Sequence, residues 1–99
     1  MSWNLKGVCL SDLGRYGEAL ESFGKAIKIN PAHAAIWNLN GVCLYNLERY
    51  DEALESFDKA TSFDPNFANA WYNKGSLLLK IGKKKEGDKC IKQAKKLRQ

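Results

Sequence analysis

The sequence repeats itself with a period of 34 residues. The stretch WNLKGVCL at residues 3–10 returns as WNLNGVCL at residues 37–44, and 19 of 31 positions are identical between residues 3–33 and 37–67. A more divergent third unit begins another 34 residues on, at Trp71. A fixed period of this length is typical of chains in which small units stack because none can bury its apolar face alone. The repeated octet is therefore interpreted as a packing unit used more than once.

Each unit is predicted to consist of two antiparallel helices. In YGEALESFGKAIKIN, residues 16–30, the apolar side chains are spaced three and four residues apart, which gives one apolar helical face. Gly14 and Gly82 are predicted to end the first helix of their units, because glycine readily adopts the left-handed conformation that terminates helices. Pro31 and Pro65 end the second helix, since proline disfavours helical geometry at the residue before it.

The positions that the units share are mostly small or aromatic. They are Trp3/Trp37/Trp71, Gly7/Gly41/Gly75, Leu10/Leu44/Leu78, Ala19/Ala53/Gly87, Phe23/Phe57/Ile91 and Ala26/Ala60/Ala94. With this skeleton and its closing prolines, the chain resembles a tetratricopeptide repeat (TPR) protein. The resemblance implies an all-α fold, an α-solenoid of three stacked antiparallel helix pairs (TPR superhelix). Residues 1–99 would form a single TPR domain, with repeats at about 1–33, 34–67 and 68–99, and the three tryptophans are expected to lie in the core.

The chain departs from the pattern of that family in several places. Lys6, Asn40 and Lys74 precede the repeated glycine, where leucine is usual, and the third unit has Gly87 instead of alanine and no proline. Only Met1 and Ser2 precede Trp3, so the first helix is expected to be short by about a turn. This suggests a fragment of a longer repeat protein or a surface for self-association, and a homo-oligomer remains open.

Chemistry-bearing motifs are nearly absent. Cys9, Cys43 and Cys90 have no metal-type spacing and are interpreted as small buried hydrophobes. The single histidine, His33, follows Pro31 at a helix entry, where a solvated turn residue is expected. We predict no catalytic residue, metal or cofactor, and hence no enzyme. Neither a secretory signal nor about 18 consecutive apolar residues occurs, so no membrane span is expected and the predicted location is cytoplasmic.

The resemblance implies a protein-interaction scaffold. In the family, the first helices line a concave groove that holds a short extended peptide. Carried over position by position, this peptide-binding groove would be lined by Asn4, Val8, Asp12, Asn38, Val42, Tyr45, Asn46, Asn69, Tyr72, Asn73, Ser76 and Leu79. Members that bind acidic chaperone tails use a clamp of Lys, Arg and Asn. Here Val8 and Val42 replace the clamp Asn, and Asn69 and Asn73 replace its Lys and Arg, so we predict against a chaperone acidic C-terminal tail.

The positive charge belongs to one end of the chain. Residues 80–99 hold nine basic and two acidic residues, a balance of +7, whereas residues 1–79 hold seven and nine, a balance of −2. Lys83, Lys84 and Lys85 form a basic patch at the start of the last helix, where positive charge opposes the helix dipole. The first interpretation is a polar cap on the terminal repeat. The alternative is an anionic partner, either nucleic acid or an acidic surface. Sequence-specific nucleic-acid recognition is not expected, because no aromatic residues interleave with the lysines.

Overall fold

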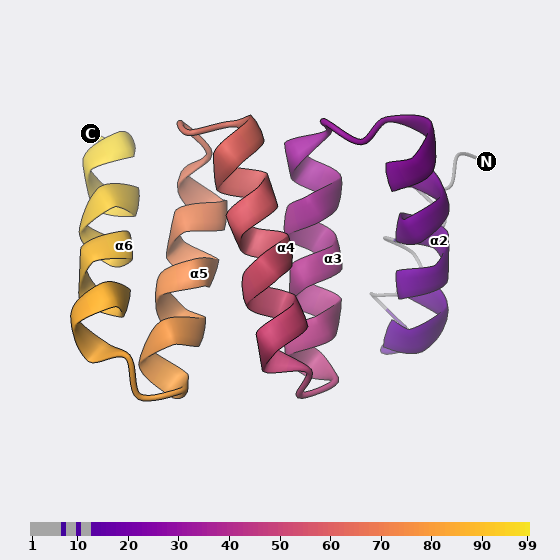
Figure 1. Cartoon of the computed structure of the whole chain (residues 1–99), viewed down its shortest axis with the longest axis horizontal. Coiled ribbons are helices and arrows are strands. Elements are labelled where there is room, and N and C mark those ends of the chain that lie inside the picture. Colours follow the sequence, from indigo (N-terminus) through magenta and orange to yellow (C-terminus); the bar gives the residue numbers. More distant parts are fainter. Residues whose placement is uncertain (1–6, 8–9, 11–12) are drawn as a thin grey trace.

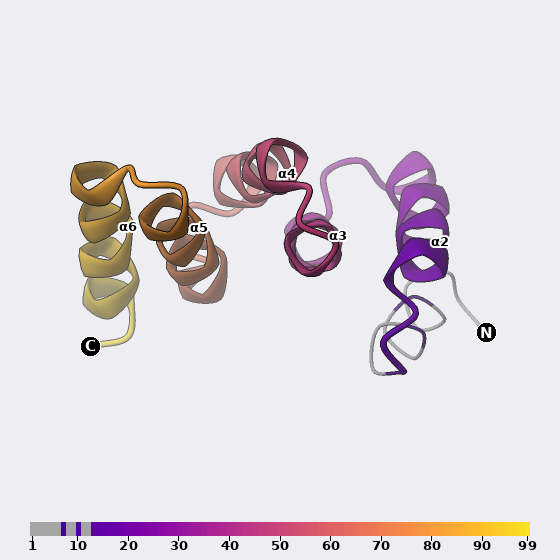
Figure 2. The ribbon, with the colours of Figure 1, turned by 90° about the horizontal axis from the view of Figure 1, so that it is seen from below.

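The computed structural model describes residue 7, residue 10 and residues 13–99, and these residues form helices and no strand. The helices are α2 (Tyr16–Ile29), α3 (Ala34–Asn46), α4 (Tyr50–Phe63), α5 (Ala68–Lys80) and α6 (Lys84–Leu97). They run side by side and alternate in direction, with α2 and α6 at the two ends (Figure 1). Seen along their length, α3 and α5 lie on one side of the arch and α4 lies on the other (Figure 2). The predicted all-α stack of helix pairs is confirmed.

The turn inside each unit is a Schellman motif, in which the chain reverses through one left-handed residue. The backbone N–H of Arg15, Arg49 and Lys83 donates to the carbonyl oxygen five residues earlier, at 2.8–2.9 Å. This closure needs a positive φ at the preceding residue. Gly14 and Gly82 supply it with φ of 76° and 90°, as predicted, and Glu48 supplies it with 61°.

Among the described residues, two clusters of the hydrophobic core share a side chain that packs against both. Ala19, Phe23, Ala26, Ile36 and Cys43 form the first cluster. Leu44, Ala53, Phe57 and Leu77 form the second cluster. Leu20 of α2 packs against both clusters. The units are therefore held together by side chains that cross from one helix pair to the next.

The tryptophans are less buried than predicted. Trp37 and Trp71 are only partly buried, and Trp3 lies outside the described residues. Each indole Nε1 donates to the carbonyl oxygen of the proline six residues earlier, Trp37 to Pro31 at 2.7 Å and Trp71 to Pro65 at 2.8 Å. This bond satisfies the indole N–H and ties the first helix to the loop before it.

The last helix exposes a polar outer face. Lys84, Asp88 and Lys95 are exposed, whereas their first-unit equivalents Tyr16, Leu20 and Ile27 are partly buried against the first cluster. Lys83 and Lys85 are exposed as well. None of the described helices has the length and hydropathy that crossing a bilayer requires.

Candidate binding groove

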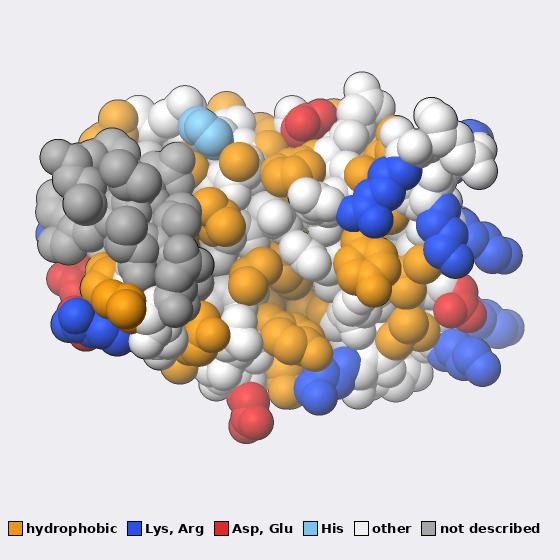
Figure 3. All heavy atoms as spheres, turned by 180° about the vertical axis from the view of Figure 1, so that it is seen from behind, with side chains coloured by type: hydrophobic (Ala, Val, Ile, Leu, Met, Phe, Trp, Pro, Cys, Tyr) orange, Lys and Arg blue, Asp and Glu red, His pale blue; other side chains and the backbone are white. Residues whose placement is uncertain are grey.

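The face formed by α3 and α5 carries a pocket of about 300 Å³. It is lined by Val42, Tyr45 and Asn46 of α3, Phe57 of α4, and Asn73 and Ser76 of α5. Figure 3 shows this face, with hydrophobic side chains gathered across its centre and Lys and Arg side chains toward one end. An aliphatic, an aromatic and several amide or hydroxyl groups thus meet at one hollow, which suits an apolar side chain and the peptide groups beside it.

The pocket is built on rigid supports. Among the described residues that line the pocket, Phe57 is the one from a second helix, and it is 1% exposed. Tyr45 packs edge-to-face on Tyr50, with ring centroids 5.5 Å apart. Lys80 places its ammonium group 6.0 Å from the Tyr50 ring centroid. Because these contacts fix the Tyr45 ring, little side-chain freedom remains to be lost on binding.

The amides of the groove are held by hydrogen bonds that the sequence did not indicate. Asn73 Nδ2 donates to Asn38 Oδ1 at 3.0 Å, and Asn38 is itself 8% exposed. Asn38 therefore orients Asn73 from below instead of facing the hollow. Asn46 Nδ2 donates to the Val42 carbonyl oxygen at 2.8 Å, which leaves its Oδ1 as the acceptor available to a ligand.

The third-unit end of the predicted groove is occupied by the chain itself. Arg98 donates to Asn69 Oδ1 at 2.6 Å, and its guanidinium carbon lies 5.7 Å from the centroid of the Tyr72 ring. Tyr72 remains 46% exposed. The Leu79 side chain lies against Gly87 of α6, not in the pocket.

The predicted groove residues thus fall into three sets. Val42, Tyr45, Asn46, Asn73 and Ser76 line one pocket. Asn38, Asn69, Tyr72 and Leu79 lie outside it, each with the contact given above, and Asn4, Val8 and Asp12 lie outside the described residues. Within the part of the chain that the structure describes, no group of three or more His, Cys, Asp and Glu side chains could bind a metal ion.

Comparison with known proteins places this geometry in context. Two family models described as tetratricopeptide repeat match residues 6–66 and 56–89. No curated protein sequence matches the chain.

Solved structures with the same fold match nearly the whole chain. The second TPR of Spaghetti (RPAP3), bound to the HSP90 peptide SRMEEVD, has a TM-score of 0.94 at 21% identity, covering 97% of this chain and 89% of that one. MamA has a TM-score of 0.92 at 22% identity, and MamA MSR-1 C2 has 0.89 at 26%. Both alignments cover 97% of this chain but only 56% and 55% of those chains, so it spans just over half their length.

Proposed function

Because the chain belongs to the tetratricopeptide repeat family, we propose that it is a non-catalytic protein-interaction scaffold that binds a short, extended peptide in the groove between α3 and α5. The observation that carries this proposal is the pocket of about 300 Å³ in which Val42, Tyr45, Asn73 and Ser76 meet. A side chain entering the pocket would remove apolar area from water, and the amides beside it would bond the peptide backbone.

The groove favours a neutral segment with one apolar anchor. Of the described residues lining the pocket, none is charged. Lys80 lies against the Tyr50 ring, and Arg98 is already engaged by Asn69 and Tyr72. Three first helices side by side would make a groove of about 20–30 Å, which accommodates about six to nine extended residues at roughly 3.3 Å each.

A displayed library of random peptides would test the proposal. Selected peptides are expected to carry one aliphatic or aromatic anchor. The paired substitutions Tyr45→Ala and Tyr72→Ala should weaken their binding by about tenfold or more, because buried aromatic contacts dominate such interfaces. The control is the triple substitution Lys83→Gln, Lys84→Gln and Lys85→Gln, which lies outside the groove. If the tyrosine variant binds every selected peptide as well as the parent chain, the groove assignment is wrong.

We propose further that acidic chaperone tails are not the partner. Although the RPAP3 repeats were solved with the peptide SRMEEVD, the aliphatic Val42 and the neutral Asn69 and Asn73 stand where clamp residues would be needed. Asn69 is also occupied by Arg98. Titration with SRMEEVD is expected to give no measurable binding at micromolar concentrations. Micromolar affinity that falls when Lys80→Ala is introduced would contradict this.

A second candidate function is suggested by the surface of α6. Lys83, Lys84 and Lys85 are all exposed, and none forms an ion pair within the described part of the chain. Such a patch would attract an anionic partner, either nucleic acid or an acidic surface. Binding to a random-sequence nucleic acid would then fall steeply with salt and be lost in the triple lysine-to-glutamine variant. Binding that is insensitive to both changes would exclude this function.

A further inference from the structure

We propose that the third unit carries a second binding site, for a small ligand that joins a flat apolar group to a carboxylate. A pocket of about 470 Å³ lies between α5 and α6. Trp71, Leu78 and Cys90 form its apolar part, and Lys74, Glu86, Lys89 and Gln93 contribute its polar groups. This volume falls within the range of ligand sites, which is about 300–1,000 Å³.

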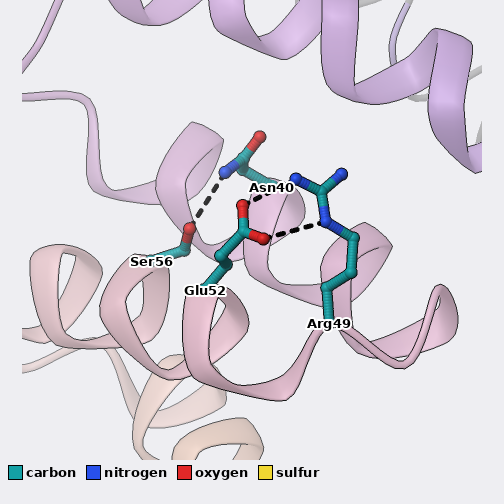
Figure 4. Close-up of polar contacts among 4 residues, drawn as sticks. All are labelled: Asn40, Arg49, Glu52 and Ser56. Atoms are coloured by element: carbon teal, nitrogen blue, oxygen red, sulfur yellow. Dashed lines mark hydrogen bonds and ion pairs between the residues drawn. The ribbon is translucent and has the colours of Figure 1, made fainter.

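The pocket opens because the third unit lacks a bridge that is present in the second. Asn40 Nδ2 donates to Ser56 Oγ at 2.9 Å and so links α3 to α4 (Figure 4). Thirty-four residues on, the same two places hold Lys74 and Cys90. A lysine and a neutral thiol form no such bridge, so the space between the helices stays open.

Lys74 is engaged by a residue of another helix. Its ammonium group forms an ion pair with Asp58 of α4 at 2.8 Å, and it lies 5.3 Å from the Trp71 ring centroid. The equivalent of Asp58 in the first unit is Gly24, which offers no such partner. The substitutions at Lys74, Asp58 and Cys90 therefore act together to create the pocket.

A second difference frees a carboxylate at the rim. In the second unit, the Arg49 guanidinium donates two hydrogen bonds to the Glu52 carboxylate, at 2.7 and 3.0 Å (Figure 4). Lys83 and Glu86 occupy these places in the third unit, and they form no ion pair among the described residues. Among the described residues that line the pocket, Glu86 is thus the single acidic group, beside Lys74 and Lys89.

The chemistry of the lining selects the ligand class. Leu78 is 2% exposed, and burial raises the pKa of the Cys90 thiol, so the floor beside the Trp71 indole is uncharged and accepts a flat ring. Asp58 already neutralises Lys74, whereas Lys89 at the rim has no ion pair among the described residues, and α6 carries six lysines against two acids. The local potential is therefore positive, and an anion can form charge-assisted hydrogen bonds with Lys89 and the Gln93 amide.

This site is separate from the peptide groove. Trp71, Lys74 and Leu78 follow one another at three- and four-residue steps and share one face of α5. Asn73 and Ser76, which line the groove, lie on the opposite face of the same helix. The two pockets share no residue, so failure of one proposal leaves the other intact.

The test uses naphthalene-2-carboxylate as the probe and the neutral naphthalene-2-carboxamide as its matched control. Each is titrated into the full chain and followed by two-dimensional ¹H–¹⁵N NMR. We expect shifts among the residues lining this pocket and not among those lining the groove. The carboxylate should bind about tenfold more tightly than the carboxamide, the effect of about one charge-assisted hydrogen bond. Shifts centred elsewhere, or no binding at millimolar concentrations, would overturn the proposal.

Two variants sharpen the result. Lys74→Asn combined with Cys90→Ser restores the bridge of the second unit and should reduce carboxylate binding by about tenfold or more. Lys89→Gln, at the exposed rim, should weaken the carboxylate but not the carboxamide, and it decides the question should the double variant fail to fold. Asn73→Ala, in the groove, is the control and should change neither. Unchanged carboxylate affinity in the Lys89→Gln variant would contradict the assigned anion contact.

Discussion

Glu48 adopts a backbone conformation that the other two units assign to glycine. Its φ is 61°, at the place where Gly14 and Gly82 have 76° and 90°. A side chain in this left-handed region costs about 1–2 kcal/mol, and glycine removes that cost while adding unfolded-state entropy. Glu48→Gly is therefore expected to raise the free energy of unfolding by about 0.5–1 kcal/mol, measured by urea denaturation. Glu48→Ala keeps the β-carbon and should give no comparable gain; equal gains in both variants would contradict the conformational argument.

Cys90 is a buried thiol whose ionisation is suppressed. Burial raises its pKa above the ordinary value, and Lys74 opposes this shift only in part. Since the thiolate is the reactive form, Cys90 should react with iodoacetamide at pH 8 about tenfold or more slowly than a cysteine in an unfolded peptide, by peptide-resolved mass spectrometry. Urea should abolish the difference, because it removes the burial. A rate in native buffer equal to that in urea would contradict the assigned shift.

At the scale of the helices, the third unit packs more closely than alanine would allow. A β-carbon on Gly87 would lie 2.9 Å from the Gly75 carbonyl oxygen and 2.8 Å from Leu79 Cγ. Alanine is the better helix former, but the Gly75 backbone cannot move aside locally to make room for the added β-carbon. Gly87→Ala should therefore lower the free energy of unfolding by about 1–3 kcal/mol, measured by thermal or chemical denaturation. It would do so even though the other units have Ala19 and Ala53 at this place.

Gly24 provides the matched control within α2. No atom lies within 4 Å of the β-carbon that alanine would add there, so Gly24→Ala should stabilise the chain by about 0.5–1 kcal/mol.

The smaller Ile91, where the other units have Phe23 and Phe57, accounts for the close approach of α6. Ile91→Phe should then reduce the cost of Gly87→Ala in a double-mutant cycle. Strictly additive changes in the free energy of unfolding would show that the two positions are not coupled, and would contradict this account.

The helices were predictable from the sequence because their signals are local. The 34-residue period, the apolar spacing within residues 16–30 and the terminating Gly14 and Gly82 each act over a few residues. The left-handed conformation of Glu48 was not predicted, because only its place in the period, and not its residue type, indicates such a turn. The partial burial of Trp37 was not predicted, because helical spacing does not encode its hydrogen bond to Pro31.

The residues that line the pocket were predictable in part, for a related physical reason. Positions on first helices identified Val42, Tyr45 and Ser76, which do line one pocket. The roles of other residues depend on partners far away in the chain. Asn38 meets Asn73 across 35 residues, and Asn69 meets Arg98 across 29. No pattern within a single unit reveals which amide a distant side chain will engage. Binding by these residues stays a prediction.

At the scale of the whole molecule, the shared packing predicts one cooperative unfolding transition. Leu77 of α5 is 0% exposed in a cluster with Leu44, Ala53 and Phe57, and Leu20 connects this cluster to the first. Leu77→Ala should lower the free energy of unfolding by about 2–5 kcal/mol. Because the units depend on their neighbours, circular dichroism and tryptophan fluorescence should report the same midpoint.

The matched control is Ile29→Ala, which also truncates a large apolar side chain in a helix. Ile29 is 75% exposed, so the change should fall within about 0.5 kcal/mol. If Leu77→Ala instead separates the two signals, with helix loss in one part of the chain preceding loss in another, the units fold independently. The helix pairs would then fold independently of one another. The groove between α3 and α5 needs two units at once, so its two sides would no longer be held rigidly together.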